Sequence, residues 1–232
     1  MLQHEGDDSR INIAIDGPAG AGKSTVARKV AEQLGYVYID TGAMYRAVTL
    51  SAQRAGITAG QTKELAELAR SLTIELAPGE NGQSVYVNGE NVTASIRSRE
   101  VTLEVSHIAA NEAVRSMLSD LQRCLAERKG VVMDGRDIGT HVLPDAELKI
   151  FLTASVRERA LRRHREIADT QPITLEQLEA EIAERDRLDE QREISPLICA
   201  SDAVVMDSTS MTIEEVTSAI VKLGRTKMAE AK

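Results

Sequence analysis

The sequence predicts an α/β fold in which five parallel strands form one sheet between layers of helices. Five short apolar runs have the length of buried strands: residues 11–16, 36–40, 131–134, 148–152 and 203–207. Helix-patterned stretches separate these runs, and this alternation is typical of a parallel sheet. Four of the runs end in an aspartate. Because ligands of such sheets bind beyond the carboxyl ends of the strands, we expect Asp16, Asp40 and Asp134 to converge on one crevice.

A glycine-rich turn follows the first strand and opens directly into a helix-patterned segment that stops at Gly35. It matches the phosphate-loop pattern G-x-x-x-x-G-K-[ST], in which glycines let the backbone close its N–H groups around phosphate oxygens. Lys23 is expected to reach the β and γ phosphates, and the Ser24 hydroxyl to bind Mg²⁺ that accompanies ATP. The expected nucleotide-binding residues of the loop are Gly17, Pro18, Ala19, Gly20, Ala21, Gly22, Lys23, Ser24 and Thr25. A plain β-to-α turn with a surface lysine is the alternative.

Composition and charge disfavour several classes of protein. The 232 residues carry a net charge of -8, so the surface as a whole does not attract nucleic acid or anionic membrane. With four Tyr, one Phe and no Trp, the chain lacks the aromatic residues for a base-stacking platform. No apolar stretch approaches the roughly 18 residues of a membrane span, and residues 1–10 lack an apolar signal region. Cys124 and Cys199 are expected to be buried thiols, and we expect a cytoplasmic protein.

The middle of the chain interrupts the alternation of strands and helices. Residues 72–77 and 84–87 read as antiparallel strands, and Asn88-Gly89 is a strong hairpin turn into residues 90–92. Two helices follow, one near residues 98–110 and one from the Asn111 cap to Lys129. We interpret residues 62–115 as an insertion beside the main sheet. Thr212 with Glu215 predicts a capping box for the last helix, and the tail after Gly224 is expected to fray.

Three charged clusters suggest a phosphate acceptor beside the nucleotide. Arg46 follows a strand end near the start of a helix, and Arg136 and Asp137 follow another strand end. Arg185, Asp189 and Arg192 have the spacing of one helix face. Arginine can bind an acceptor phosphate bidentately. Solvated turns, or a surface row of salt bridges, are the alternatives for these clusters.

The densest basic segment covers residues 157–165 and contains five arginines, among them Arg162 and Arg163. In a chain of negative net charge, this local reversal suggests a lid over transferring phosphates. A solvated helix with Glu/Arg pairs is the alternative. That alternative suits Arg157 and Arg165 better than it suits the two adjacent arginines.

The combination of these motifs resembles the bacterial cytidylate kinases over residues 11–223. The segments that carry the resemblance are residues 15–25, 40–46, 134–140, 149–152, 184–186 and 207–209. The resemblance implies a three-layer P-loop kinase fold with a CMP-binding insertion and a short lid, acting as a monomer on ATP and on CMP or dCMP. The implied divisions are a core of residues 11–61, 116–156 and 190–224, an insertion of residues 62–115, a lid with flanking helices of residues 157–189, and tails of residues 1–10 and 225–232.

The same resemblance assigns roles within the expected site. By that likeness the acceptor phosphate is bound by Thr41, Arg46, Arg136 and Arg192. Ser106, Arg115 and Asp137 would read cytosine, and Arg185 and Asp189 would hold the ribose. Arg162, with Arg163 beside it, would belong to the lid over ATP. The residues implied in catalysis are Lys23, Arg136, Arg162 and Arg192.

The assignment to cytosine agrees with the chemistry of the base. Cytosine presents an N4 amino donor beside the N3 and O2 acceptors, whereas uracil reverses the pattern at positions 3 and 4. A carboxylate paired with arginine therefore favours CMP and dCMP over UMP. Two other hypotheses remain open at this point. One is a P-loop kinase of broader pyrimidine specificity or with another small acceptor, and the other is a nucleotide-dependent switch without an acceptor.

Overall fold

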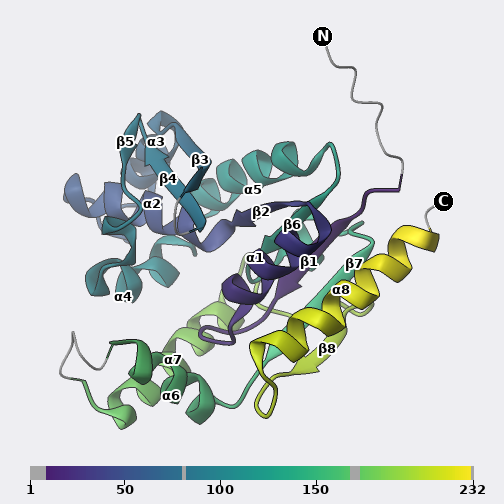
Figure 1. The fold of residues 1–232 in the computed structure, drawn as a ribbon. Coiled ribbons are helices and arrows are strands. Elements are labelled where there is room, and N and C mark those ends of the chain that lie inside the picture. Colours follow the sequence, from purple (N-terminus) through teal and green to yellow (C-terminus); the bar gives the residue numbers. More distant parts are fainter. Residues whose placement is uncertain (1–8, 80–81, 168–172, 231–232) are drawn as a thin grey trace.

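The structure is a computed structural model that describes residues 9–79, 82–167 and 173–230. Its central sheet has five parallel strands in the order β2-β6-β1-β7-β8, with β1 in the middle (Figure 1). The strands are β1 (Asn12–Asp16), β2 (Val37–Asp40), β6 (Val131–Asp134), β7 (Leu148–Thr153) and β8 (Val204–Asp207). All five runs that the sequence predicted as strands are confirmed to within one residue. The expectation that each is buried is wrong for β8, where Val204 and Val205 are exposed, because β8 is an edge strand of the sheet.

Helices cover both faces of this sheet, which gives the three layers. α1 (Lys23–Leu34) and α8 (Ile213–Glu230) lie together on one face, where Ile13 and Ile15 of β1 belong to their apolar core. Ala14 points to the other core, which packs under α2 (Thr41–Arg54) and α5 (Glu112–Ala126). This alternation along β1 is the two-residue period of a strand buried on both faces.

The strand ends place three aspartates at one edge of the sheet, as the sequence predicted. Asp40 of β2 lies in register with Asp134 of β6, and Ile15, next to Asp16, is in register with Asp134 on the other side. The strands on the two sides of β1 come from different parts of the chain: β2 and β6 lie on one side, and the later strands β7 and β8 lie on the other. The loop after β1 therefore opens at the switch point, where open α/β sheets bind ligands.

The predicted antiparallel strands form a separate three-stranded sheet. Its strands are β3 (Ile74–Gly79), β4 (Gly82–Val87) and β5 (Glu90–Asn91), and its neighbours in the chain are α3 (Thr62–Ser71), η1 (Ser95–Arg97) and α4 (Arg99–Ile108). Gln83 connects this sheet to the edge of the main one. Its side chain accepts from the Asp40 N–H at 3.0 Å and donates to the Tyr38 carbonyl at 2.7 Å, as a neighbouring strand would.

Two further helices, α6 (Val156–Ile167) and α7 (Leu175–Gln191), pack on each other below α4 in Figure 1, and an ion pair of Arg99 with Glu181 joins α4 to α7. Their contact has its own small apolar core of Ala160, Ile167, Leu178 and Ile182. The predicted lid segment thus lies on helices, although residues 168–172 of it fall outside the described residues. η2 (Ile138–Val142) follows β6.

The last helix, α8, decides two of the expectations from sequence. The capping box of the last helix is confirmed, because Thr212 Oγ1 accepts from Glu215 N–H and the Glu215 carboxylate accepts from Thr212 N–H. The expectation of fraying after Gly224 is wrong, since α8 continues to Glu230. Met228 packs against the core there, and a Lys227–Glu230 ion pair supports the last turn.

The expectation that both cysteines are buried is also wrong, because Cys124 and Cys199 are exposed. Of the predicted N-terminal tail, residues 1–8 lie outside the described residues. Among the helices of the described part of the chain, none is both long and apolar enough to cross a bilayer.

Candidate functional site

The phosphate loop has the backbone conformation that its glycines predict. Gly17, Gly20 and Gly22 have φ angles of 145°, 75° and 86°, which L side chains rarely adopt. At Gly17 an added Cβ would lie 2.0 Å from the Leu152 carbonyl oxygen of the neighbouring strand β7. Gly22 is the N-cap of α1, so the loop ends at a helix N-terminus, where free N–H groups and the helix dipole favour an anion.

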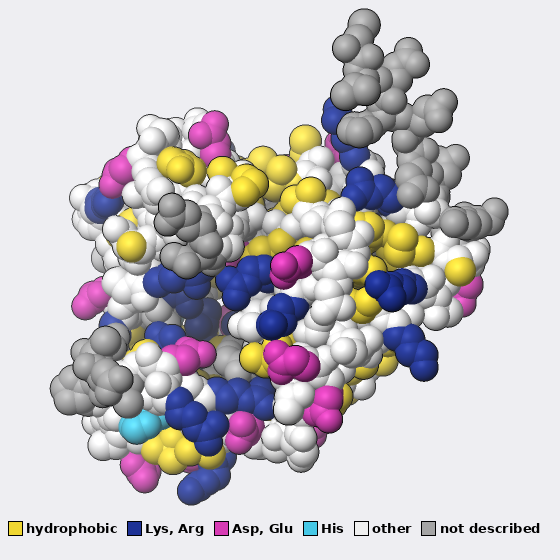
Figure 2. All heavy atoms as spheres, viewed as in Figure 1, with side chains coloured by type: hydrophobic (Ala, Val, Ile, Leu, Met, Phe, Trp, Pro, Cys, Tyr) yellow, Lys and Arg dark blue, Asp and Glu magenta, His cyan; other side chains and the backbone are white. Residues whose placement is uncertain are grey.

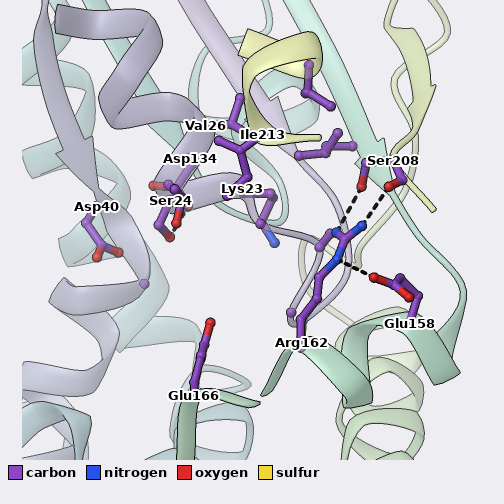
Figure 3. Close-up of a pocket in the computed structure, with 18 of the residues that line it drawn as sticks. Lys23, Ser24, Val26, Asp40, Asp134, Glu158, Arg162, Glu166, Ser208 and Ile213 are labelled. Carbon is purple, nitrogen blue, oxygen red and sulfur yellow. Dashed lines mark hydrogen bonds and ion pairs between the residues drawn. The ribbon is translucent and has the colours of Figure 1, made fainter. Parts of the chain in front are cut away.

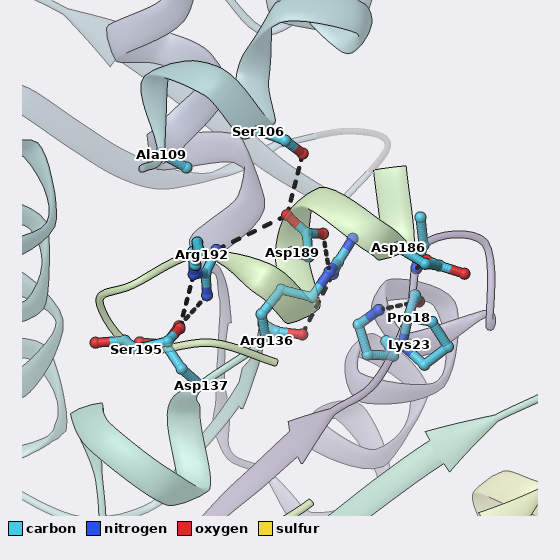
Figure 4. Close-up of polar contacts among 12 residues, drawn as sticks. Pro18, Lys23, Ser106, Ala109, Arg136, Asp137, Asp186, Asp189, Arg192 and Ser195 are labelled. Atoms are coloured by element: carbon cyan, nitrogen blue, oxygen red, sulfur yellow. Dashed lines mark hydrogen bonds and ion pairs between the residues drawn. The ribbon is translucent and has the colours of Figure 1, made fainter. Parts of the chain in front are cut away.

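Lys23 lies buried at the base of the loop. Its Nζ donates to the Pro18 carbonyl oxygen at 2.7 Å, so the loop itself holds the end of this side chain (Figure 4). Burial, and then the positive charge of Arg136, hold the pKa of Lys23 well below its ordinary value. An anion bound in the loop would favour the charged form of this lysine.

Asp134, at the end of β6, holds the Ser24 hydroxyl. Ser24 Oγ donates to Asp134 Oδ2 at 2.8 Å, and the Tyr38 hydroxyl donates to Oδ1 at 2.9 Å. Burial, and then the charge of Asp40, raise the pKa of Asp134 to about 7. Sequence reasoning brought Asp134 to the crevice but gave it no role. Its position in register with Asp40 at the strand ends was the available signal.

Asp16 has a different surrounding from the other two strand-end aspartates. Its two carboxylate oxygens accept the N–H groups of Ile138 and Gly139 at 2.8 and 2.7 Å. Burial raises its pKa to about 6, although these two hydrogen bonds act in the opposite direction. Asp16 therefore supports the start of η2, directly after Asp137.

A cleft of about 510 Å³, here called the phosphate-loop cleft, opens above this loop. Ala19 to Thr25 line one side, and Arg162 of α6 reaches in from the other (Figure 3). Arg162 is held by Glu158 at 3.0 Å and by the hydroxyl and carbonyl of Ser208 at 3.2 and 2.6 Å. Ser208 is a site contact that sequence reasoning missed, although residues 207–209 were part of the resemblance.

A second space, here called the acceptor cavity, adjoins the cleft and has a volume of about 50 Å³. It collects all of the predicted acceptor-binding residues except Arg46: Thr41, Ser106, Arg115, Arg136, Asp137, Arg185, Asp189 and Arg192. Arg136 and Arg185 line the cleft as well as the cavity, so the two spaces are contiguous. The structure therefore brings the two predicted halves of the site together.

Asp189 is the centre of the polar contacts in this cavity (Figure 4). Its Oδ1 accepts from Ser106 Oγ at 3.0 Å, and its Oδ2 accepts from Arg136 Nε at 2.8 Å. Arg192 Nη1 lies 3.8 Å from Oδ1. Burial opposes the ionisation of Asp189, but Arg136, Arg185 and Arg192 outweigh it and lower its pKa.

Asp137 pairs with two arginines at the other end of the cavity. Arg115 Nη2 donates to Asp137 Oδ2, and Arg192 Nη2 lies 3.6 Å from Oδ1. The Arg115 side chain is 2 % exposed, stacks 5.3 Å from the Tyr45 ring centroid, and donates to the Ala109 carbonyl. A buried ion pair of this kind offers a carboxylate and a guanidinium to one edge of a polar ligand.

Unsatisfied donors in the cavity point to a ligand. Within the described part of the chain, Arg115 Nε, Arg185 Nε and Arg192 Nη2 are buried and make no hydrogen bond. Burial, and then Arg136, lower the pKa of Arg185 to about 9. Buried donors are rarely left without an acceptor, so a bound anion or base would complete them.

Arg46 lies at the junction of the phosphate-loop cleft with a third space of about 720 Å³ beside α4. Its Nη1 donates to Thr102 Oγ1 at 2.7 Å, and burial lowers its pKa to about 10. Figure 2 shows Lys and Arg side chains gathered around the hollow between the small sheet and the α6–α7 pair. This local positive charge contrasts with the net charge of the whole chain.

Three predicted residues differ in their surroundings from the expectation. The Thr41 hydroxyl donates to the Asp134 carbonyl at 2.6 Å, so its proton is engaged within the protein. Arg163 lines the third space instead of the phosphate-loop cleft, and it pairs with Glu166 at 3.1 Å. Arg192 is the C-cap of α7, so only Arg185 and Asp189 of that cluster lie on the helix.

Sequence comparisons with known proteins agree on one family. The protein-family model described as Cytidylate kinase matches residues 13–226 of the chain. The cytidylate kinase of Geobacillus kaustophilus (strain HTA426) is 57 % identical over 215 residues, which cover 92 % of this chain and 96 % of that protein. The cytidylate kinase of Exiguobacterium sibiricum is 55 % identical over the same shares. A solved structure of an uncharacterized protein from Eubacterium ventriosum has a TM-score of 0.51 at 11 % identity, covering 94 % of this chain and 99 % of that one, which shows a shared fold alone.

Proposed function

The chain belongs to the cytidylate kinase family, and we propose that its two contiguous spaces bind ATP and CMP for direct transfer of the γ-phosphoryl group. The observation that carries this proposal is the shared lining by Arg136 and Arg185. These two cations stand between the phosphate loop and the cavity that contains Asp137 and Asp189. A phosphate bound on either side would approach them, so they lie where the transferring group must pass.

The phosphate-loop cleft is the proposed site of ATP and Mg²⁺. Mg²⁺ is a hard cation that prefers oxygen ligands. The Ser24 hydroxyl and the Asp134 carboxylate supply two such oxygens beside the loop, 2.8 Å apart. Ser24 would hold the metal, with Asp134 beside it. When bound, Mg²⁺ neutralises charge on the β and γ phosphates. Lys23 would exchange its contact with the Pro18 carbonyl for a phosphate oxygen.

CMP is proposed to bind in the acceptor cavity together with the third space of about 720 Å³, because about 50 Å³ alone cannot hold a nucleotide and the two spaces share Ser106 and Arg185 in their linings. We propose that Arg46, Arg136 and Arg192 bind its phosphate with Thr41 close by, that Arg185 and Asp189 hold the ribose, and that Ser106, Arg115 and Asp137 read the base. The buried nitrogens Arg115 Nε, Arg185 Nε and Arg192 Nη2 support this division, because none of them makes a hydrogen bond within the described part of the chain. dCMP would use the same base and phosphate contacts, and we propose that it is also a substrate.

The chemistry asks little of a proton acceptor. A phosphate oxygen of CMP is already anionic, so it forms the new bond to the γ-phosphorus while the bond to the bridging oxygen of ATP breaks, and ADP leaves with that oxygen. No proton is removed in this step, and a general base is not required. Lys23, Arg136, Arg162 and Arg192 would neutralise the charge that the transfer spreads over the phosphoryl oxygens.

Cytosine would be selected by the buried pair of Asp137 and Arg115. Asp137 is an acceptor for the N4 amino group, and Arg115 is a donor for the neighbouring ring acceptors. Uracil would present its O4 to the carboxylate and leave a buried acceptor unpaired. We therefore propose that CMP and dCMP are strongly preferred over UMP.

We further propose that the protein acts as a monomer on free nucleotides in the cytoplasm. One chain supplies the lining of both spaces, and the positive charge is confined to the site in a chain of net charge -8. The surface as a whole therefore offers no general attraction to a polyanion.

Initial rates measured while both substrates are varied test this function. The proposal expects ADP to form only when an acceptor is present, with rates that saturate in ATP and in CMP. A nucleotide-dependent switch would instead release ADP at a slow rate that CMP does not change, and that result would reject the proposed transfer.

A further inference from the structure

Arg159 of α6 and Asp186 of α7 form a buried ion pair directly against the phosphate loop. Arg159 Nη1 donates to Asp186 Oδ2 at 2.6 Å, and the two side chains are 5 % and 11 % exposed. Neither residue was assigned a role by the sequence. Asp186 lies beside Pro18 of the loop in Figure 4.

The pair binds both the N–H and the carbonyl group of Ala19 in the loop. Ala19 N–H donates to Asp186 Oδ1 at 3.1 Å, and the Ala19 carbonyl accepts from Arg159 Nη1 at 2.8 Å. Arg159 Nε is itself fixed by the Ala154 carbonyl at 2.8 Å. The guanidinium and the carboxylate thus present one donor and one acceptor to Ala19 at fixed positions.

Packing at the next residue strengthens this connection. A Cβ added to Gly20 would lie 3.3 Å from the Arg159 Cβ, so α6 touches the loop backbone there. Ala19 and Gly20 both line the phosphate-loop cleft. The ion pair thus links α6 and α7 to each other and to the loop, in addition to the small apolar core that the two helices share.

We propose that Arg159 and Asp186 are positioning residues that hold the phosphate loop in its nucleotide-binding shape and couple the α6–α7 pair to ATP affinity. Side chains engage both the N–H and the carbonyl group of Ala19. The two peptide groups on either side of the Ala19 Cα are therefore prevented from rotating toward the phosphates. The N–H groups of the other loop residues are then already arranged for the phosphates before ATP binds. The inference rests on the proposed function, since it assigns this loop to ATP.

The decisive variant removes the pair without leaving a buried charge. Single substitutions at either residue leave the partner charged and unpaired, which destabilises a protein, whereas apolar replacement of both residues is often neutral for stability. We therefore choose Arg159→Met with Asp186→Leu as a double variant. Arg159→Lys serves as the conservative variant, because lysine keeps the charge but cannot bond Ala19, Asp186 and Ala154 together.

A matched control exists on the same two helices. Arg157 Nη1 of α6 lies 3.6 Å from Glu179 Oε1 of α7, and the Arg157 side chain is 72 % exposed. Arg157→Met removes an ion pair between α6 and α7 that involves no residue of the loop. Dissociation constants for ATP and for CMP are measured separately by calorimetry on each full-length variant, together with kcat and the thermal midpoint.

The proposal expects the double variant to bind ATP at least about tenfold more weakly, since two hydrogen bonds to the loop are lost, while CMP affinity changes less than about twofold. Arg159→Lys should fall between it and the wild type, and Arg157→Met should match the wild type. If ATP affinity is unchanged in the double variant, or if ATP and CMP affinities fall together with thermal stability, the proposal is overturned. If the double variant does not fold, Arg159→Lys tests the proposal instead: its ATP affinity should fall by more than its CMP affinity, and equal changes in the two affinities would overturn the proposal. A wild-type protein that does not bind ATP would reject the proposed function itself.

Discussion

Arg162 and Ser208 join α6 to the end of the central sheet. Arg162 Nη1 donates to the Ser208 hydroxyl at 3.2 Å, and Nη2 donates to the Ser208 carbonyl at 2.6 Å. Ser208 follows the last strand and is buried, so the guanidinium is anchored at the edge of the phosphate-loop cleft. Under the proposed function, this arginine lines the cleft that takes the phosphates of ATP.

Arg162→Ala is expected to lower kcat by roughly 10³, because an arginine that stabilises phosphoryl transfer is worth about that factor or more in related reactions. The fold should be retained, since the side chain is one quarter exposed. Arg187→Ala on α7 is a suitable control, because Arg187 is exposed and its ion pair is with Glu184 of its own helix. A steady-state assay in which Arg162→Ala keeps a near-wild-type kcat would remove Arg162 from the catalytic residues.

Ser24→Ala is expected to raise the Mg²⁺ concentration needed for half-maximal rate by about tenfold or more, as loss of one ligand contact commonly does. Ser24→Thr keeps the hydroxyl that donates to Asp134, and it should stay near the wild type. Removal of Mg²⁺ by a chelator should abolish turnover in all three proteins. Equal Mg²⁺ titrations for wild type and Ser24→Ala would contradict the proposed metal ligand.

Asp137→Asn is expected to lower kcat/KM for CMP by about 10² or more and to raise the ratio of UMP to CMP use. The amide can turn its NH₂ group toward the uracil O4, whereas the carboxylate cannot donate. The ratio of the two substrates is the right measurement, because the variant leaves Arg115 buried without its partner and lowers the folded fraction equally for both assays.

Asp120→Asn offers a matched control for that experiment, since Asp120 pairs with Arg123 on the surface. Its ratio of UMP to CMP use should equal that of the wild type. A ratio that is also unchanged in Asp137→Asn would exclude Asp137 from base reading.

Asp16 should make the protein less stable as the pH rises. Its pKa is raised from 3.8 to about 6, so between these values the unfolded chain ionises while the folded protein still holds the proton. The stability contributed by the protonated group is complete below the lower value and is lost as the pH passes the higher one. At about 1.4 kcal/mol for each pH unit, the loss amounts to about 3 kcal/mol.

Denaturant unfolding of wild type and Asp16→Asn at a series of pH values from 4 to 7 measures this effect. The difference in unfolding free energy should change in favour of the variant by up to about 3 kcal/mol over this range. Asp145→Asn, at an exposed position, corrects for general effects of removing a carboxylate. A difference that stays constant with pH would show that Asp16 titrates alike in both states.

The features predicted well from sequence are those encoded within short segments. The five strand runs, the glycine φ angles of the phosphate loop and the capping box at Thr212 each depend on neighbouring residues. The buried apolar period and the requirement for positive φ are local physical signals. The family resemblance then named the acceptor residues, and the structure brings all but Arg46 to one cavity.

The features that sequence reasoning did not find depend on contacts between distant segments. Ser24 and Asp134 are 110 positions apart, and Ala19 and Asp186 are 167 positions apart. No periodicity links such residues. Asp186 directly follows Arg185, which was assigned to the ribose, yet successive helix residues point in different directions and meet different partners. The helical tail after Gly224 was missed because the packing of Met228 is tertiary.

The central claim is transfer of a phosphoryl group from ATP to CMP, and ADP release with a panel of acceptors tests it most directly. The panel contains CMP, dCMP, UMP, AMP and shikimate, each with ATP and Mg²⁺, and a reaction without acceptor. Rapid ADP release is expected with CMP and dCMP, and release with the other three acceptors should be lower by orders of magnitude. Equal release with UMP, or release that is the same with and without any acceptor, would contradict it.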